Sequence, residues 1–229
     1  MRSRPRSFLA HAAAPELRPV VVASVTLGIA VGVFAIAFGV GAVAAGGTVV
    51  QACTMSLLVF TGASQFSAVS VIASGGSTAS ALGSAMLLAA RNGVYGLTMA
   101  RHLDGSLGRR LVAAQLTIDE SAAMATAQDD PDATRAAFWI TGGAVFVFWN
   151  LGTLVGALAG EAIDPETYGL DAAFPAAFVA MLAPHLRTRT GRVVAIAGAL
   201  ICLTLVPFAP IGVPILCAAS AALIGLRAP

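Results

Sequence analysis

The chain has 229 residues, of which 58% are hydrophobic and only 10% are charged, with a mean hydropathy of +0.87. A soluble domain carries roughly 25% charged residues, so the composition excludes an ordinary soluble fold and predicts one integral membrane domain. The formal charge of +2 comes with no lysine, and the arginines stand in short clusters between apolar runs. This distribution indicates membrane orientation and argues against nucleic-acid binding.

Residues 1–18 are predicted to be a cytoplasmic tail. Their arginines imitate a secretory signal, but the apolar stretch from Ser7 to Ala10 is shorter than the roughly 7–15 residues of a signal core. Residues 19–229 are expected to form a single all-α transmembrane domain with about seven or eight hydrophobic segments.

The apolar segments alternate with polar or basic loops, and two of them, Thr48–Ser74 and Ala172–Leu186, are interrupted. In chain order they are Val20–Ala45, Thr48–Ser74 with the polar sequence FTGASQF, Ala79–Ala100 with Arg91 near its centre, Leu111–Ala127 with QLTIDES, Phe138–Gly160, Ala172–Leu186 with Pro175 and Pro184, Val193–Val206 and Ile211–Leu226. Glycines in the first segment predict close approach of neighbouring helices.

An internal repeat is predicted over residues 20–101 and 137–207. Residues 28–46 align without gaps on residues 142–160 at an offset of 114, with seven identities. The following segment is interrupted in both halves, by FTGASQF and by LDAAFPAAF.

The arginines distinguish two topologies. If every apolar segment crosses the membrane, the basic loop at 101–110 lies outside. If Thr48–Ser74 and Ala172–Leu186 are instead re-entrant or broken, every basic cluster is cytoplasmic and only Arg135 lies outside, in agreement with the positive-inside rule. This second solution gives the two halves opposite topology, as in many secondary transporters.

Arg91 is costly at mid-membrane, by about 2.5–3.5 kcal/mol on insertion scales, and needs a partner. Asp119 and Glu120 are consecutive and lie at comparable depth, so one is expected to pair with Arg91 while the other faces elsewhere. The pair would either fix helix register or take part in binding a substrate carboxylate or a coupling proton. Alternatively, residues 111–127 form an interfacial helix with both acids in water.

Within FTGASQF, Gly62 is expected to break the helix, and Ser64 and Gln65 supply uncharged donors and acceptors. Freed helix ends suit a zwitterion, although ordinary packing through small polar residues is the alternative. Phe60, Phe66, Phe148 and Trp149 are candidates for an apolar side-chain pocket or for packing. Asn150 and Thr153 are comparable polar groups in the second half.

Enzymatic and metal chemistry find no support in the sequence. GxSxG, HExxH and a phosphate loop with its lysine are all missing, and the cysteines at 53, 202 and 217 stand in apolar segments without a CxxC pair. We expect no catalytic residues, no metal ligands and no cofactor.

Five short motifs in order resemble the AzlC family of bacterial branched-chain amino acid exporters, over about residues 18–187. They are GASQF at 62–66, RNGVYG at 91–96, LTIDES at 116–121, WNLGT at 149–153 and GLDAAFPAAF at 169–178. The positions that match the family pattern are Gly62, Ser64, Gln65, Arg91, Tyr95, Gly96, Asp119, Glu120, Asp171 and Pro175.

The resemblance implies a multi-pass inner-membrane exporter of branched-chain or other apolar amino acids, with a cytoplasmic N-terminus and a small hydrophobic AzlD-like partner subunit. The family often has Asn-x-Arg-His where this chain has Ala89-Ala90-Arg91-Asn92. No AzlD-like portion is present in the chain, so a partner would be separate or unnecessary.

The expected site lies between the two broken segments. Gly62, Ser64, Gln65, Arg91, Asn150 and Pro175 would bind substrate, and Asp119 or Glu120 would carry the coupling proton. The alternatives are a membrane scaffold that transports nothing and an uncoupled channel for small solutes.

Overall fold

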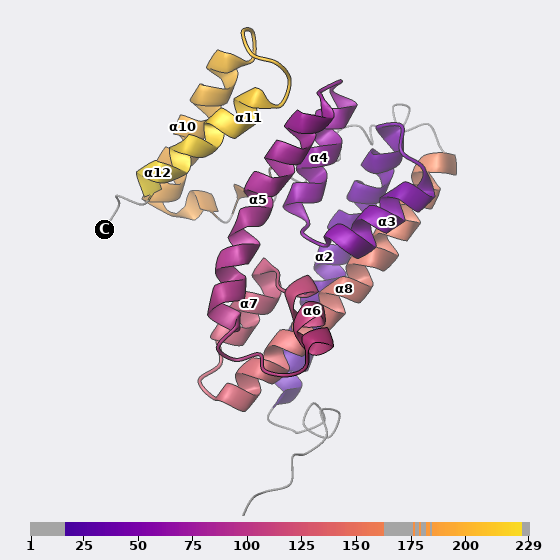
Figure 1. Ribbon diagram of the computed structural model, residues 1–229, viewed down its shortest axis with the longest axis vertical. Helices are drawn as coiled ribbons and strands as arrows, with labels where there is room; N and C mark the ends of the chain where they lie inside the picture. The colour runs from indigo at the N-terminus through magenta and orange to yellow at the C-terminus, as the bar shows by residue number, and fades with distance from the viewer. Residues whose placement is uncertain (1–16, 163–175, 177–178, 180–181, 184, 226–229) are drawn as a thin grey trace, which may run out of the picture.

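The computed structural model describes residues 17–162, 176, 179, 182–183 and 185–225. Regular structure within these residues is helical, in agreement with the predicted all-α class. The helices, labelled as in Figure 1, are α2 (Arg18–Ala44), α3 (Val49–Val59), α4 (Ala63–Ala73), α5 (Thr78–Met99), α6 (Leu107–Gln115), α7 (Asp119–Thr126), α8 (Pro131–Ala162), η3 (His185–Arg187), α10 (Arg189–Leu205), α11 (Val213–Ala218), η4 (Ala219–Ala221) and α12 (Ala222–Gly225).

The long helices α2 and α8 pack side by side and run in the same direction (Figure 1). Near their N-terminal ends the hydroxyls of Ser24 and Thr141 share a hydrogen bond of 2.7 Å. Further along, a Cβ built at Gly152 would lie 2.2 Å from the carbonyl oxygen of Gly32. Glycine allows the two backbones to approach this closely. In a membrane no hydrophobic driving force brings helices together, so close packing through small residues takes its place.

The parallel course of α2 and α8 does not fit an inverted relation between residues 28–46 and 142–160. An inverted repeat would send these two segments across the membrane in opposite directions. Both helices supply small residues to one common seam. The wider repeat over 20–101 and 137–207 includes residues outside the described part of the chain.

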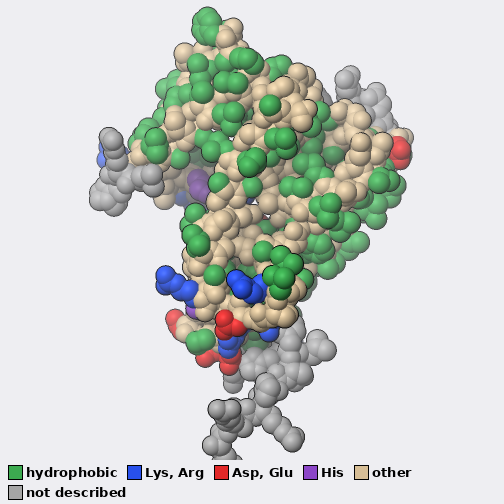
Figure 2. Space-filling view, viewed as in Figure 1, with side chains coloured by type: hydrophobic (Ala, Val, Ile, Leu, Met, Phe, Trp, Pro, Cys, Tyr) green, Lys and Arg blue, Asp and Glu red, His purple; other side chains and the backbone are tan. Residues whose placement is uncertain are grey.

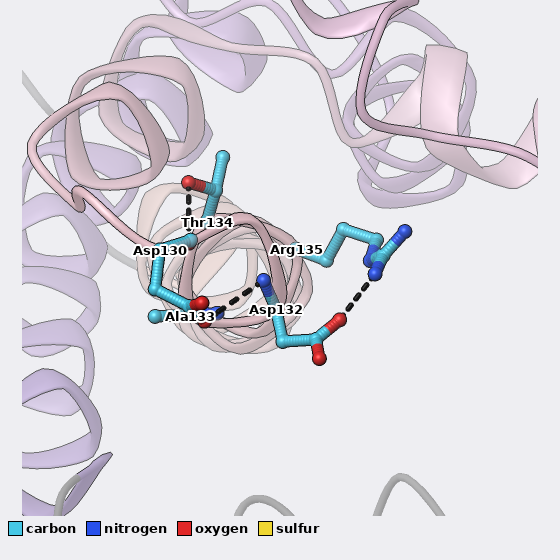
Figure 3. Close-up of polar contacts among 5 residues, drawn as sticks. All are labelled: Asp130, Asp132, Ala133, Thr134 and Arg135. Carbon is cyan, nitrogen blue, oxygen red and sulfur yellow. Dashed lines mark hydrogen bonds and ion pairs between the residues drawn. The ribbon is translucent and has the colours of Figure 1, made fainter. Parts of the chain in front are cut away.

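The start of α8 is fixed by side-chain capping (Figure 3). Asp130 Oδ2 accepts hydrogen bonds from the backbone N–H groups of Asp132, at 3.0 Å, and Ala133, at 2.8 Å. Thr134 Oγ1 donates to the Asp130 carbonyl oxygen at 2.9 Å. Arg135 forms an ion pair with Asp132 in the same turn. These contacts satisfy N–H groups that a helix start leaves without partners, so α8 begins at a defined position.

The apolar run 48–74 is broken, as predicted. It forms α3 and α4, which converge at residues 60–62 (Figure 1). Met55 on α3 and Val69 on α4 line one cavity together with Ala42 near the end of α2. The two arms therefore lie side by side, and the segment returns to the end of the bundle from which it entered. We call this pair the first hairpin.

The segment 111–127 is also broken, and neither predicted form, a single span or an interfacial helix, is observed. Its two helices, α6 and α7, meet at residues 116–118, where Ser121 Oγ donates to the Leu116 carbonyl oxygen at 2.7 Å. This second hairpin contacts the middle of α8, since a Cβ built at Gly142 would lie 3.0 Å from Leu116 Cβ.

The two hairpins enter from opposite ends of the bundle and touch at their inner ends. Gln115 Nε2, at the end of α6, donates to the carbonyl oxygen of Leu57, near the end of α3, at 2.9 Å. The chain therefore brings two interrupted segments together at mid-height, where a broken backbone needs partners inside the protein.

Charged side chains gather at the end of the bundle where α2 and α8 begin (Figure 2). The basic loop 101–110 lies at this end, as the re-entrant topology predicted, and the Arg109 guanidinium lies 5.5 Å from the ring centre of Trp139 on α8. Arg135 lies here too, so its predicted placement on the opposite side is wrong. The cause is the second hairpin, which returns the chain to this end before α8 begins. We call this the arginine-rich end.

On the face shown in Figure 2, hydrophobic side chains and uncharged polar or backbone atoms cover most of the remaining surface. Exposed large hydrophobic residues occur on α2, α3, α5, α8 and α10. Among the described helices, α2 and α8 are long and apolar enough to cross a membrane. The C-terminal helix α10 packs against α11, η4 and α12. This group contacts α5 through α11, where Leu216 lies beside Gly83.

Candidate functional site

A cavity of about 200 Å³ lies where the two hairpins meet the middle of α2, α5 and α8. We call it the central cavity. It combines charged groups with an aromatic wall, and its lining residues are Val31, Phe34, Phe60, Thr61, Gly62, Ala63, Phe66, Arg91, Ile118, Asp119, Glu120, Val145, Trp149 and His185. An apolar cavity of about 150 Å³ can hold benzene, so the central cavity admits a solute of several heavy atoms.

The turn of the first hairpin is built around Gly62, whose φ of +58° is rarely adopted by residues with a side chain. Gln65 closes this turn, because Gly62 N–H donates to Gln65 Oε1 at 3.2 Å and Gln65 N–H donates to the Gly62 carbonyl at 2.9 Å. Ser64 is hydrogen-bonded to the Thr61 hydroxyl. Gly62 and Thr61 line the cavity, whereas Ser64 and Gln65 are fully buried behind its wall and hold the turn.

Arg91 and Asp119 form an ion pair inside the cavity wall, with Arg91 Nη1 2.7 Å from Asp119 Oδ2. Their side chains are 40% and 39% exposed. Glu120 also lines the cavity but has no ion-pair partner within the described residues. This arrangement confirms the prediction that one of the two acids pairs with Arg91, while both acids line the same cavity.

Two helix N-termini border the cavity. Gly62 and Ala63 begin α4, while Ile118 and Asp119 begin α7. The first N–H groups of a helix have no partner within it, and they carry a partial positive charge. The N-terminus of α7 stabilises its own acids, Asp119 and Glu120, in the first turn. The N-terminus of α4 has no acidic residue in its first turn, and its first residues, Gly62 and Ala63, line the cavity.

Three of the four aromatic candidates, Phe60, Phe66 and Trp149, line the cavity and form its aromatic wall. Phe66 and Trp149 pack edge to face, with ring centres 6.2 Å apart. Phe148 is different, because it packs against the glycine seam of α2, where a Cβ built at Gly28 would lie 2.9 Å from its ring.

Three buried N–H donors near the cavity lack a hydrogen-bond acceptor among the described residues: Gln65 Nε2, Arg91 Nε and Trp149 Nε1. A buried Trp N–H usually finds a partner, and an unsatisfied group costs about 1–3 kcal/mol. Their position beside a cavity favours water or a polar solute as the missing acceptor.

The remaining predicted residues do not join this cluster. Asn150 Nδ2 donates to the Phe146 carbonyl oxygen at 2.8 Å, and Asn150 does not line the cavity. Thr153 is buried and hydrogen-bonded to Ser56 at 3.1 Å. Pro175 lies outside the described residues, as does most of the predicted second broken segment.

Sequence reasoning missed Thr61 as a cavity residue, and it missed Val31, Phe34 and Val145 from the long helices. Thr61 directly precedes Gly62, the glycine that breaks the helix, and this position could have predicted that Thr61 lines the cavity. Single apolar residues within long apolar helices carry no such signal, because their neighbours have the same character.

An apolar exterior, two helices of membrane-spanning length and a charged central cavity define this protein as a helical membrane protein with an internal solute-sized site. The family model described as AzlC protein matches residues 26–163, which is more than half of the chain, and the chain belongs to the AzlC family. AzlC is a transporter family associated with branched-chain amino acid transport. No curated protein and no solved structure matches the chain.

Proposed function

We propose that this protein is a secondary transporter that exports branched-chain or other apolar amino acids. The observation that carries the proposal is the central cavity, where charged groups and a helix N-terminus face an aromatic wall between two interrupted segments. Broken helices that meet near mid-membrane are the usual construction of a substrate site in secondary transporters.

The cavity matches the two chemical parts of an apolar amino acid. The carboxylate of a zwitterion is attracted by the N-terminus of α4 at Gly62 and Ala63. Its ammonium group is attracted by the carboxylate of Glu120. Its apolar side chain fits against Phe60, Phe66 and Trp149. The volume of about 200 Å³ is of the right order for such a molecule.

The three charged side chains take different roles in this proposal. Arg91 and Asp119 already neutralise each other at 2.7 Å, so they position the hairpin against α5. Glu120 has no ion-pair partner within the described residues and is the group that binds either the substrate ammonium or a proton. Alternation between these two states would exchange one inward-moving proton for one exported amino acid, since both compete for the same carboxylate.

The orientation follows from the arginines. The arginine-rich end is assigned to the cytoplasm, because positive residues in short loops are retained there. This assignment gives a cytoplasmic N-terminus in the bacterial inner membrane. The exposed apolar faces of α3 and α5 are available to lipid or to a small AzlD-like subunit, and the family resemblance favours such a partner.

The test is efflux from proteoliposomes loaded with radiolabelled leucine, with and without a proton gradient and with and without a co-reconstituted AzlD-like subunit. We expect the wild-type chain to export leucine faster when protons can flow inward. Glu120→Gln should lose this proton dependence, whereas Glu161→Gln, the same change on the exposed last turn of α8, should keep it.

The outcomes separate the alternatives. No efflux under any condition would favour a membrane scaffold, and efflux that neither saturates nor responds to protons would favour an uncoupled channel. Normal proton-coupled efflux by Glu120→Gln would remove Glu120 from the proposed coupling role.

A further inference from the structure

A second cavity, of about 350 Å³, lies at the end of the bundle opposite the arginine-rich end. We call it the outer cavity. It is lined mostly by apolar side chains of α2, α3 and α4, among them Ala42, Ala45, Met55, Val69 and Ile72. At its rim Gly46 is exposed, and a Cβ built there would meet nothing within 4 Å. The outer cavity is therefore open toward the end of the bundle.

The two cavities are aligned along the same pair of helices. On α2, Phe34 lines the central cavity and Ala42 lines the outer cavity. On α4, Phe66 lines the central cavity and Val69, one turn further on, lines the outer cavity. A solute that moves along α2 and α4 would pass from one cavity into the other.

A single layer of aromatic rings lies between them. Phe38 stands one helical turn from both Phe34 and Ala42 and is fully buried. Its ring centre lies 5.6 Å from that of Phe66 and 6.1 Å from that of Trp149. We call these three rings the aromatic layer. Close-packed interiors leave few voids that a solute can use, so the layer closes the route in this structure.

We propose that the outer cavity is a further binding site for the transported amino acid on its way out, and that the aromatic layer is the barrier between this site and the central cavity. The proposal rests on the proposed function for the identity of the solute. The apolar lining, together with Gln51 as a polar side chain, suits an apolar amino acid whose charged groups remain in water at the open rim.

The barrier is tested by cysteine accessibility, which does not depend on transport. In a chain whose native cysteines at 53, 202 and 217 are replaced by alanine, Val31→Cys marks the central cavity and Ala45→Cys the outer cavity. Asp104→Cys marks the arginine-rich end and reports the orientation of each vesicle preparation. A membrane-impermeant maleimide is then applied from each face.

We expect the face opposite Asp104→Cys to admit the maleimide to Ala45→Cys at once and to leave Val31→Cys at background. Phe38→Ala should raise labelling of Val31→Cys from that face well above background. The matched control is Phe138→Ala, which removes an equally buried ring on α8 that lines neither cavity. It should leave Val31→Cys protected. Phe38→Leu, a smaller change, covers the case in which Phe38→Ala does not fold, and it should give intermediate labelling.

Labelling of Val31→Cys from that face with Phe38 intact would overturn the proposal, as would equal labelling with Phe38→Ala and Phe138→Ala. Protection of Ala45→Cys would show that the outer cavity is not open and would also overturn it. To separate this result from the proposed function, leucine efflux is measured for the same variants. If the labelling follows the expected pattern but no variant exports leucine, the aromatic layer is supported as a barrier and leucine is rejected as the transported solute.

Discussion

The glycine seam between α2 and α8 gives a sharp prediction for Gly156. A Cβ built at Gly156 would lie 2.0 Å from the carbonyl oxygen of Ile36, where ordinary contact begins at 3.4 Å. The opposing atom is backbone, so no rotamer change can relieve the clash and the helices must separate by more than 1 Å at this point. Overpacking of a well-packed interior costs about 1–3 kcal/mol, and we expect Gly156→Ala to cost the upper part of this range.

Gly143→Ala is the matched control on the same helix. A Cβ at Gly143 would meet nothing within 4 Å, so alanine should stabilise the helix by about 0.5–1 kcal/mol through its higher propensity. The same substitution therefore has opposite signs at two positions of α8, and the sign is set by the neighbouring backbone alone.

Thermal unfolding in detergent, followed by the fluorescence of Trp139 and Trp149, measures both effects. A change of 1 kcal/mol shifts Tm by about 2–4 °C in a chain of this size. We expect Gly156→Ala to lower Tm by about 4–12 °C and Gly143→Ala to raise it by about 1–4 °C. A Gly156→Ala protein that unfolds at or above the wild-type temperature would refute the close parallel packing of α2 and α8.

Three further predictions concern the central cavity. Arg91→Gln should destabilise the protein by about 1–2 kcal/mol, because Asp119 loses its partner in a half-exposed ion pair. The double variant Arg91→Gln with Asp119→Asn should recover most of the lost Tm, and the absence of any recovery would contradict the pairing. Gly62→Ala should cost about 1–2 kcal/mol because of its positive φ, although a Cβ there would make only an ordinary contact, 3.7 Å from the Trp149 ring. An unchanged Tm would show that the turn is not as described. Gln115→Leu removes the hydrogen bond to the Leu57 carbonyl and should cost about 0.5–1.5 kcal/mol; hydrogen exchange at the hairpin tips should rise, and unchanged exchange would show that the tips are held in another way.

The sequence predicted structure best at residues whose burial in a membrane segment costs free energy unless a specific partner or a helix break is present. Gly62 among polar residues in an apolar run predicted a break, and the structure has the break there. Arg91 near mid-membrane required an acid, and consecutive acids point in different directions on a helix, so one of the two acids was expected to pair with it. The structure shows that this acid is Asp119.

The second hairpin shows where this reasoning fails. Its break at residues 116–118 consists of Leu, Thr and Ile, with neither glycine nor proline, so no local signal separates it from a continuous helix. Ser121 determines the turn by accepting from the Ile118 N–H and donating to the Leu116 carbonyl. The sequence therefore predicts the counterpart of the first broken segment in Ala172–Leu186, most of which lies outside the described residues. Within the described residues, Ile118, Asp119 and Glu120 line the central cavity together with Gly62.

Periodicity could not reveal the pairing of α2 with α8 either. Small residues at regular spacing show that a helix packs closely, but not against which helix or in which direction. In this chain both partners carry the same kind of seam, and the direct contacts between Gly32 and Gly152 and between Ile36 and Gly156 appear only in the structure.

The aromatic layer also determines how the transmembrane voltage acts on this protein. From Phe34 to Ala42 the layer spans about 12 Å of α2, compared with about 30 Å of hydrocarbon in a bilayer. With water in both cavities, most of the voltage falls across this short distance, and an elementary charge that crosses it gains or loses about 2.3 kcal/mol per 100 mV. A zwitterion that crosses this distance does no net electrical work, because its net charge is zero. A proton that crosses it to or from Glu120 does electrical work. Export should therefore generate a current whose sign reports the proton, even though the amino acid itself carries no net charge.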